Sequence, residues 1–140
     1  MSEQFKILTQ FVKDMSSETP DAETYLYVKE YLKNYNLNID ITTKPLKNRM
    51  IEVNTKLSYM DKGKSKNKSY FEITYASIIK IEEQIKDKKT IEKIILCDVQ
   101  KEIYPNLEKI FINLLSNSGF PGIKFEKKVD FEQLYNQRLN

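Results

Sequence analysis

Residues 51–81 of the chain read IEVNTKLSYMDKGKSKNKSYFEITYASIIKI, two alternating runs of apolar and polar side chains joined by a polar loop. The alternating positions are Ile51, Val53, Thr55, Leu57 and Tyr59 in the first run, and Phe71, Ile73, Tyr75, Ser77, Ile79 and Ile81 in the second. A period of two residues is typical of a β-strand with one buried face. Because the connecting loop is short, the two runs are expected to form a long antiparallel hairpin.

Two further strands and a short helix are expected before this hairpin. The first strand has an apolar side opposite a polar side: Phe5, Ile7, Phe11 and Met15 against Gln10, Val12, Asp14, Ser16 and Glu18. The second strand carries Leu37, Ile39 and Ile41 and ends at Lys44-Pro45, since proline lacks a ladder donor. Between the strands, residues 20–34 show helical spacing, with Thr19 and Pro20 suited to the cap and first turn.

The apolar spacing becomes helical after Lys89, and Pro105 is expected to interrupt that helix and to begin another. The clearest helical stripe is Leu107, Ile110, Phe111, Leu114 and Leu115. Gly119 is expected just past the helix end, and Asp130 with Gln133 predicts the cap of a last short helix. Strands followed by helices indicate an α+β fold, and 140 residues suit one domain spanning 1–140.

Composition argues against an enzyme and against a metal or cofactor site. The chain has no histidine, which is the usual general base and the commonest metal ligand. Its single cysteine, Cys97, has neither a histidine partner nor a second thiol, so we expect it to be a small buried side chain. No phosphate-binding or dinucleotide glycine motif is present, and no catalytic residue is assigned.

The N-terminus does not resemble a signal peptide, and no apolar run approaches the roughly 20 residues that span a bilayer, so a cytoplasmic protein without membrane insertion is expected. The net charge of +3 is too balanced to indicate a nucleic-acid partner. The basic segments Lys62–Lys68 and Lys86–Lys93 are interpreted as solvated loops.

Asp14 and Glu18 lie four residues apart on the polar side of the first predicted strand. That spacing corresponds to about 13 Å, at about 3.3 Å per residue. The carboxylates of glycoside hydrolases lie only about 5–9.5 Å apart, so this pair does not fit a catalytic dyad. A binding or assembly protein with an acidic stripe is the remaining interpretation.

Several segments together resemble one known family. FVKDMSSETPDA, residues 11–22, is similar to the pattern Y-x-K-D-x-S-F-E-x-P-x-A, and Ile51-Glu52-Val53 is similar to Y-E-V. Tyr104-Pro105-Asn106 resembles a C-P-N motif, and Gly119-Phe120-Pro121 followed by Val129–Tyr135 resembles F-P…V-[ND]-F-x-x-L-[YF]. These motifs, in this order, resemble the bacterial protein-export chaperone SecB family over nearly the whole chain. One departure is KIFIN, residues 109–113, where the family usually has F-P-[YF]-A-R.

The resemblance implies a four-stranded antiparallel sheet with a long helix and a short C-terminal helix packed on one side. Members bind unfolded precursor proteins without ATP, deliver them to the translocase motor SecA, and usually form homo-tetramers, as dimers of dimers. The family's SecA-binding positions correspond to Asp14, Glu18, Tyr70 and Glu72. Its client-binding positions correspond to Tyr25, Leu26, Tyr31, Leu37, Phe131, Leu134 and Tyr135.

The long helical stripe is too apolar to be solvated, so Leu107, Ile110, Phe111 and Leu114 are expected at the interface between chains. Two alternatives remain open. The protein could be a SecB-like chaperone dedicated to another client, such as an antitoxin. It could also be a small nucleic-acid-binding module that uses Lys62–Lys68.

Overall fold

The structure is a computed structural model, and it describes residues 4–63, 66–125 and 128–138. Four strands form the sheet: β1 (Phe5–Glu18), β2 (Tyr35–Pro45), β3 (Met50–Asp61) and β4 (Tyr70–Ile81). The helical elements are α1 (Ala22–Tyr31), the 3-10 turn η1 (Leu32–Asn34), α2 (Lys88–Lys93), the π-helical segment η2 (Ile94–Asp98), α3 (Val99–Asn117) and α4 (Phe131–Arg138). The element order is the α+β order expected from the sequence.

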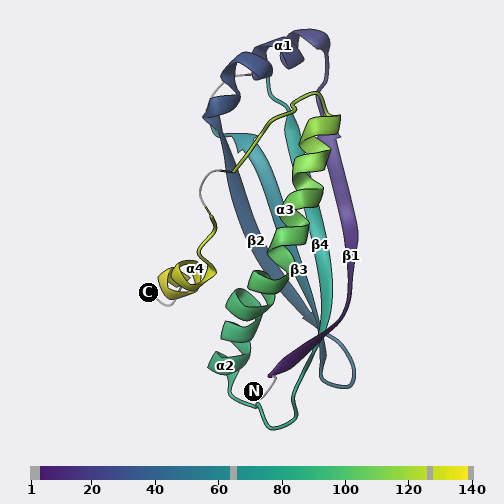
Figure 1. Ribbon diagram of the computed structural model, residues 1–140, viewed down its shortest axis with the longest axis vertical. Coiled ribbons are helices and arrows are strands. Elements are labelled where there is room, and N and C mark those ends of the chain that lie inside the picture. Colours follow the sequence, from purple (N-terminus) through teal and green to yellow (C-terminus); the bar gives the residue numbers. More distant parts are fainter. Residues whose placement is uncertain (1–3, 64–65, 126–127, 139–140) are drawn as a thin grey trace.

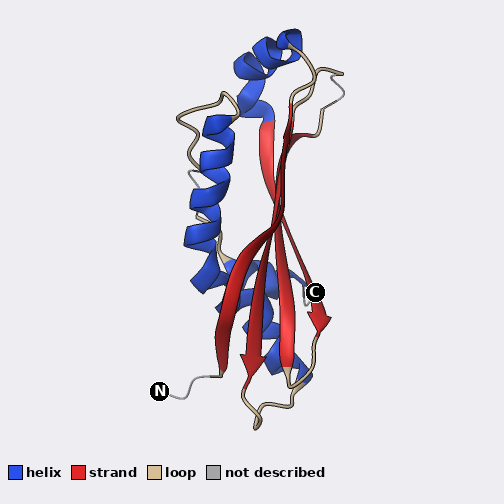
Figure 2. Cartoon of the chain, turned by 90° about the vertical axis from the view of Figure 1, so that its right-hand side faces the viewer, coloured by secondary structure: helices blue, strands red, loops and turns tan. Residues whose placement is uncertain are grey.

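The sheet is antiparallel throughout, with strand order β1-β4-β3-β2. The predicted hairpin is confirmed, because β3 pairs with β4 and Leu57 lies opposite Ile73. Helix α3 runs along one face of the twisted sheet, and α1 lies at one end of it (Figures 1 and 2). The predicted fold class is therefore confirmed, and β1 and β2 form the two edges of the sheet.

The core lies between α3 and the inner face of β3 and β4. The residues of α3 that face the sheet recur every four positions and are fully buried: Ile103, Leu107, Phe111 and Leu115. Burial of each such side chain contributes about 1.5–3 kcal/mol relative to its exposure. Leu107 and Phe111 were expected at an interface between chains, and this assignment needs correction. Both are covered by their own sheet, whereas Ile110 and Leu114 keep part of their surface exposed.

The predicted two-sided pattern of β1 is wrong in part, because the strand shifts register twice. Irregularities between Ile7 and Thr9 and between Val12 and Asp14 each insert one residue into β1. Phe11 consequently lies opposite Ala76 on the outer face, and Val12 lies opposite Tyr75 on the helix-covered face. A bulge reverses the side to which every later residue points, and strict alternation cannot foresee it.

Pro105 does not interrupt the long helix, contrary to expectation. Helical structure is continuous from Lys88 to Asn117, and Pro105 lies exposed inside α3. The irregularity falls instead in η2, where the helix widens next to the buried Gln100. The Gln100 amide accepts a hydrogen bond from Thr55 Oγ1 at 2.9 Å and donates one to the Ile95 carbonyl at 3.2 Å. This polar network joins the wide turn to the centre of β3.

The helix ends are set by local chemistry. Asp21, rather than Thr19, caps α1 by accepting a hydrogen bond from the Thr24 backbone N–H at 2.8 Å. Asp130 accepts one from the Gln133 N–H at 3.0 Å, which confirms the predicted cap of α4. Part of the second basic segment is helical, since α2 begins at Lys88. The first basic loop includes residues 64–65, which lie outside the described residues.

Candidate functional site

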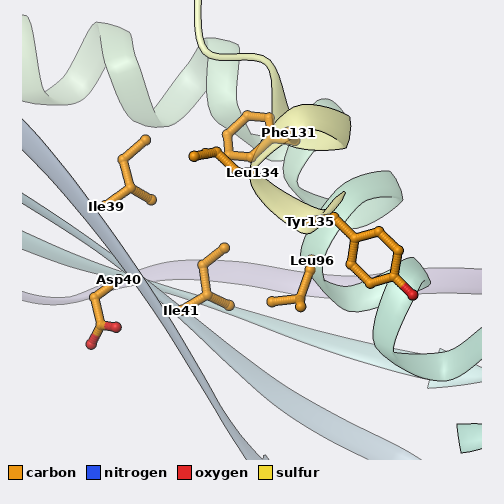
Figure 3. A pocket seen from close by; sticks show the side chains of 7 residues that line it. All are labelled: Ile39, Asp40, Ile41, Leu96, Phe131, Leu134 and Tyr135. Atoms are coloured by element: carbon orange, nitrogen blue, oxygen red, sulfur yellow. The ribbon is translucent and has the colours of Figure 1, made fainter. Parts of the chain in front are cut away.

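An apolar groove of about 230 Å³ lies between the edge strand β2 and helix α4. Figure 3 shows the side chains of Ile39 and Ile41 on the same side of β2 as α4, while Asp40 points to the opposite side of the strand. The residues lining the groove are Ile39, Asp40, Ile41, Leu96, Phe131, Leu134 and Tyr135. The groove is thus walled by aliphatic and aromatic side chains with a single carboxylate at its rim.

Helix α4 is held beside the sheet by a few contacts. Phe131 is buried and packs edge-to-face on Tyr104 of α3, with ring centroids 5.3 Å apart. Lys101 of α3 forms an ion pair with Glu132 at 2.8 Å. Leu134, by contrast, is 43% exposed. Phe131 and Glu132 therefore fix the position of α4, and Leu134 presents apolar surface to solvent.

The groove reaches down to the π-helical segment η2. Four consecutive side chains, Ile94 to Cys97, are buried there, which a helix covered on only one side does not show. Helix α4 contacts η2 from the side. Leu96 contributes to the groove wall. The burial of Cys97 raises the pKa of its thiol and agrees with the predicted structural role.

The expected client-binding residues do not form one surface. Phe131, Leu134 and Tyr135 meet at the groove, and Leu37 precedes Ile39 on the same face of β2. Tyr25 lies at the other end of the molecule, where its ring packs against Phe120 with centroids 5.1 Å apart.

Leu26 and Tyr31 lie on α1, also at that end of the molecule (Figure 1). Leu26 is 63% exposed, and the Tyr31 ring packs at a tilt against the Tyr27 ring, with centroids 4.5 Å apart. The α1 residues form a second apolar surface, and the strip of Leu37, Ile39 and Ile41 on β2 runs from it toward α4.

The outer face of the sheet gathers the expected SecA-binding residues. Asp14 lies opposite Thr74, Ser16 opposite Glu72, and Glu18 opposite Tyr70. Residues paired across antiparallel strands share a face, so the carboxylates of Asp14, Glu18 and Glu72 all point to the side away from α3. Tyr70 is half-exposed on the same face. The four residues therefore lie on one face of the sheet, and their binding to SecA stays a prediction.

Two lysines are interleaved with this acidic surface. Lys56 Nζ lies 2.6 Å from Glu72 Oε1, and Lys13 Nζ lies 2.7 Å from Glu52 Oε2. The hydrogen bond to Glu72 raises the pKa of Lys56, and the hydrogen bonds from Lys13 and Asn54 lower the pKa of Glu52. The surface is therefore mixed in charge rather than uniformly acidic.

Strand β1 carries several exposed apolar side chains. Large apolar side chains on both of its faces have two-fifths or more of their surface exposed: Leu8, Phe11, Val12 and Met15. Its outer edge also carries backbone groups that no described strand pairs. Such an edge favours association with another chain.

Among the described residues, no cluster of three or more His, Cys, Asp or Glu side chains could hold a metal ion. The helices of residues 4–63, 66–125 and 128–138 include none that is long and apolar enough to cross a membrane.

Comparison with known proteins identifies the family. A family model described as preprotein translocase subunit SecB matches residues 1–140. A putative protein-export protein SecB of Pelagibacter ubique is 58% identical over 140 residues, covering 100% of this chain and 100% of that protein. The chain belongs to the SecB family.

More distant SecB and SecB-like proteins are also similar to the chain, in sequence or in fold. The protein-export protein SecB of Parvibaculum lavamentivorans is 27% identical over 96% of this chain and 79% of that protein. A Mycobacterium tuberculosis SecB-like chaperone, solved in complex with a ChAD peptide from an antitoxin, aligns with a TM-score of 0.66 at 10% identity, covering 90% of this chain and 88% of that one. The structural likeness shows a SecB-like fold, and family membership places the chain among export chaperones.

Sequence reasoning missed four of the residues that line the groove in this SecB-family chain: Ile39, Asp40, Ile41 and Leu96. The sequence placed Ile39 and Ile41 only on a strand, and it gave neither Asp40 nor Leu96 a binding role. Ile39 and Ile41 stay partly accessible because β2 is an edge strand that α3 does not cover, whereas Leu96 is almost fully buried and reaches the groove from η2. The available signal was the Lys44-Pro45 end of β2, because proline is typical of edge strands.

Proposed function

We propose that this SecB-family chain holds unfolded precursor proteins in the groove between β2 and α4, without nucleotide, before their export. The observation that carries the proposal is the apolar lining of that groove, with Leu134 and Ile41 accessible beside the buried Phe131. The protein-export names of its relatives support the same function.

The chemistry of the groove suits clients of many sequences. Burial of apolar surface is favourable by about 25 cal/mol per Å² and is not directional, so it does not require a particular client sequence. Aromatic side chains such as Tyr135 add contact area and have few torsions to immobilise. An unfolded chain exposes the apolar segments that a folded protein hides, which gives selectivity for the unfolded state.

The test is suppression of the aggregation of an unfolded precursor, followed by light scattering in the absence of nucleotide. The wild-type protein should suppress aggregation stoichiometrically, and Leu134→Ser/Tyr135→Ser should suppress it less. Leu26→Ser, which changes a more exposed leucine on α1, reports whether the second apolar surface contributes. A double variant that folds and suppresses aggregation as the wild type does would refute the assignment of the groove.

The proposal includes delivery to SecA through the outer face of the sheet. Asp14, Glu18 and Glu72 share that face with the half-exposed Tyr70, as the family resemblance implies. Aligned carboxylates attract a basic segment and steer its approach, which is the chemistry of the basic, zinc-containing tail that SecA carries. The apolar groove lies on the opposite side of the sheet, so client and motor would occupy different surfaces.

The proposal also includes assembly into a homo-tetramer, as a dimer of dimers. The open edge of β1 and its exposed apolar side chains support an interface between copies of the chain. Ile110 and Leu114 of α3 keep part of their apolar surface exposed and are the remaining helical candidates for such an interface.

A further inference from the structure

Lys56 lies in the middle of the outer face of the sheet, among the carboxylates of the proposed docking surface. Across the sheet, Asp14 pairs with Thr74, Thr74 with Lys56, and Lys56 with Asp40. The lysine thus stands in one row between two carboxylates, one from each edge strand. All of these side chains point away from α3, because residues paired across antiparallel strands share a face.

The ammonium group of Lys56 forms an ion pair with Glu72, the central carboxylate of the proposed docking surface. Nζ and Oε1 are 2.6 Å apart, and the two side chains keep 44% and 35% of their surface exposed. Two shallow hollows adjoin the pair. One is bordered by Asp14, Asp40 and Lys56, and the other by Glu18, Tyr70 and Glu72. The ion pair is therefore accessible and lies where the two hollows meet.

We propose that Lys56 acts as an internal competitor for the docking surface, so that a basic partner must displace its ammonium group to reach Glu72. This inference rests on the proposed docking of a basic segment on Asp14, Glu18 and Glu72. It adds that a residue of this chain limits the affinity for that segment. The role follows from geometry, since a partner cation and Lys56 would require the same carboxylate oxygen.

A lysine suits such a role better than an arginine. Its ammonium is a compact charge on a flexible four-carbon stem, so it can leave Glu72 for solvent without disturbing the strand. An incoming arginine could bind Glu72 through two parallel hydrogen bonds and replace the single contact that Lys56 makes. The competition lowers affinity without abolishing it, because an exposed ion pair is weak.

Lys13 provides a matched comparison on the same face. It also forms a short ion pair, but its partner is Glu52, outside the proposed docking set. Lys56→Met and Lys13→Met each remove one positive charge and keep most of the apolar stem. A general change in surface potential would affect both variants alike, whereas release of Glu72 is specific to Lys56→Met.

The experiment is calorimetric titration of the full-length protein with the zinc-loaded SecA tail peptide at low salt. Lys56→Met should bind about two- to fivefold more tightly than the wild type, the range that corresponds to an exposed ion pair. Lys13→Met should change affinity less. Equal effects of the two variants, or unchanged or weaker binding by Lys56→Met, would overturn the inference. Thermal unfolding of each variant checks that the fold is intact.

The docking proposal is tested separately by Asp14→Lys/Glu18→Lys/Glu72→Lys. If this variant no longer binds the peptide and Lys56→Met binds it no more tightly than the wild type, the docking proposal is supported and only the competitor role of Lys56 is refuted. If the charge-reversed variant binds as the wild type does, the docking surface itself is wrong and the role of Lys56 falls with it.

Discussion

The hydroxyl group of Tyr25 donates a hydrogen bond of 2.7 Å to the carbonyl oxygen of Gly119. Gly119 follows the end of α3 with a φ of +100°, and a Cβ built on it would lie 2.6 Å from Tyr25 Cε1. The residue therefore satisfies two demands at once, a left-handed backbone and a close approach by an aromatic ring. Through this contact α1 is tied to the far end of α3.

Gly119→Ala should lower the free energy of unfolding by more than the cost of the left-handed backbone alone, because the new Cβ would also clash with Tyr25. Gly122 provides the control, because its φ is +81° and a Cβ there would meet nothing within 4 Å. Left-handed backbone costs an L-residue about 1–2 kcal/mol, so Gly122→Ala should lose about that much. Gly119→Ala should lose at least about 1 kcal/mol more, since overpacking typically costs about 1–3 kcal/mol. Chemical denaturation measures both, and equal losses would show that the contact with Tyr25 is unimportant.

Gln100→Leu should destabilise the protein by about 1–3 kcal/mol. It leaves the buried Thr55 hydroxyl without its acceptor, and an unsatisfied buried polar group costs about that much. Thr55→Val/Gln100→Leu should regain part of the loss, because both polar partners are then absent. A double-mutant cycle in urea measures the coupling, and additive losses would mean that the hydrogen bond contributes nothing.

Met15→Lys should lower the oligomeric mass while leaving the protomer folded. Met15 is 47% exposed on β1, so within one chain the substitution is tolerated, whereas a charge buried against a second chain is not. Phe111→Asp should instead unfold the protomer, since Phe111 is fully buried in the core. Light scattering and circular dichroism separate these outcomes. A wild-type protein that is monomeric at high concentration would contradict the assembly proposal.

Reversal of the three outer-face carboxylates, by Asp14→Lys/Glu18→Lys/Glu72→Lys, should strongly reduce binding to the SecA tail. Aligned charges act together, and their reach shortens with salt, from about 10 Å at 0.1 M to about 3 Å at 1 M. The difference from the wild type should therefore shrink as salt is added. Suppression of client aggregation should be retained, because the groove lies on the other side of the sheet. If the variant and the wild type bind the SecA tail equally well at low salt, the outer face of the sheet is an ordinary solvated surface.

Much of the fold could be read from local patterns. The alternation in residues 51–81 predicted the hairpin, and the apolar stripe beginning at Leu107 predicted the helix that covers it. The cap at Asp130 and the turn at Gly119 were visible because such positions have narrow chemical preferences. Family motifs spread along the chain indicated a SecB fold, and the family match agrees.

Features that depend on distant contacts were misread. Pro105 can remain inside a continuous helix because packing on the sheet outweighs a local cost of about 3 kcal/mol. The side to which Phe11 points depends on bulges in β1, which reflect pairing with β4 rather than any pattern within the strand.

The sequence by itself determined which segments form strands and helices, because periodicity and capping act over a few residues. Only the tertiary structure decided which apolar residues become core and which stay accessible. Leu107 and Ile110 belong to one helical stripe, yet only Leu107 is fully covered by the sheet. Ile39 and Ile41 line an open groove because β2 is an edge strand and α4 lies beside it. Exposure depends on what packs from elsewhere in the chain, and no local pattern records that.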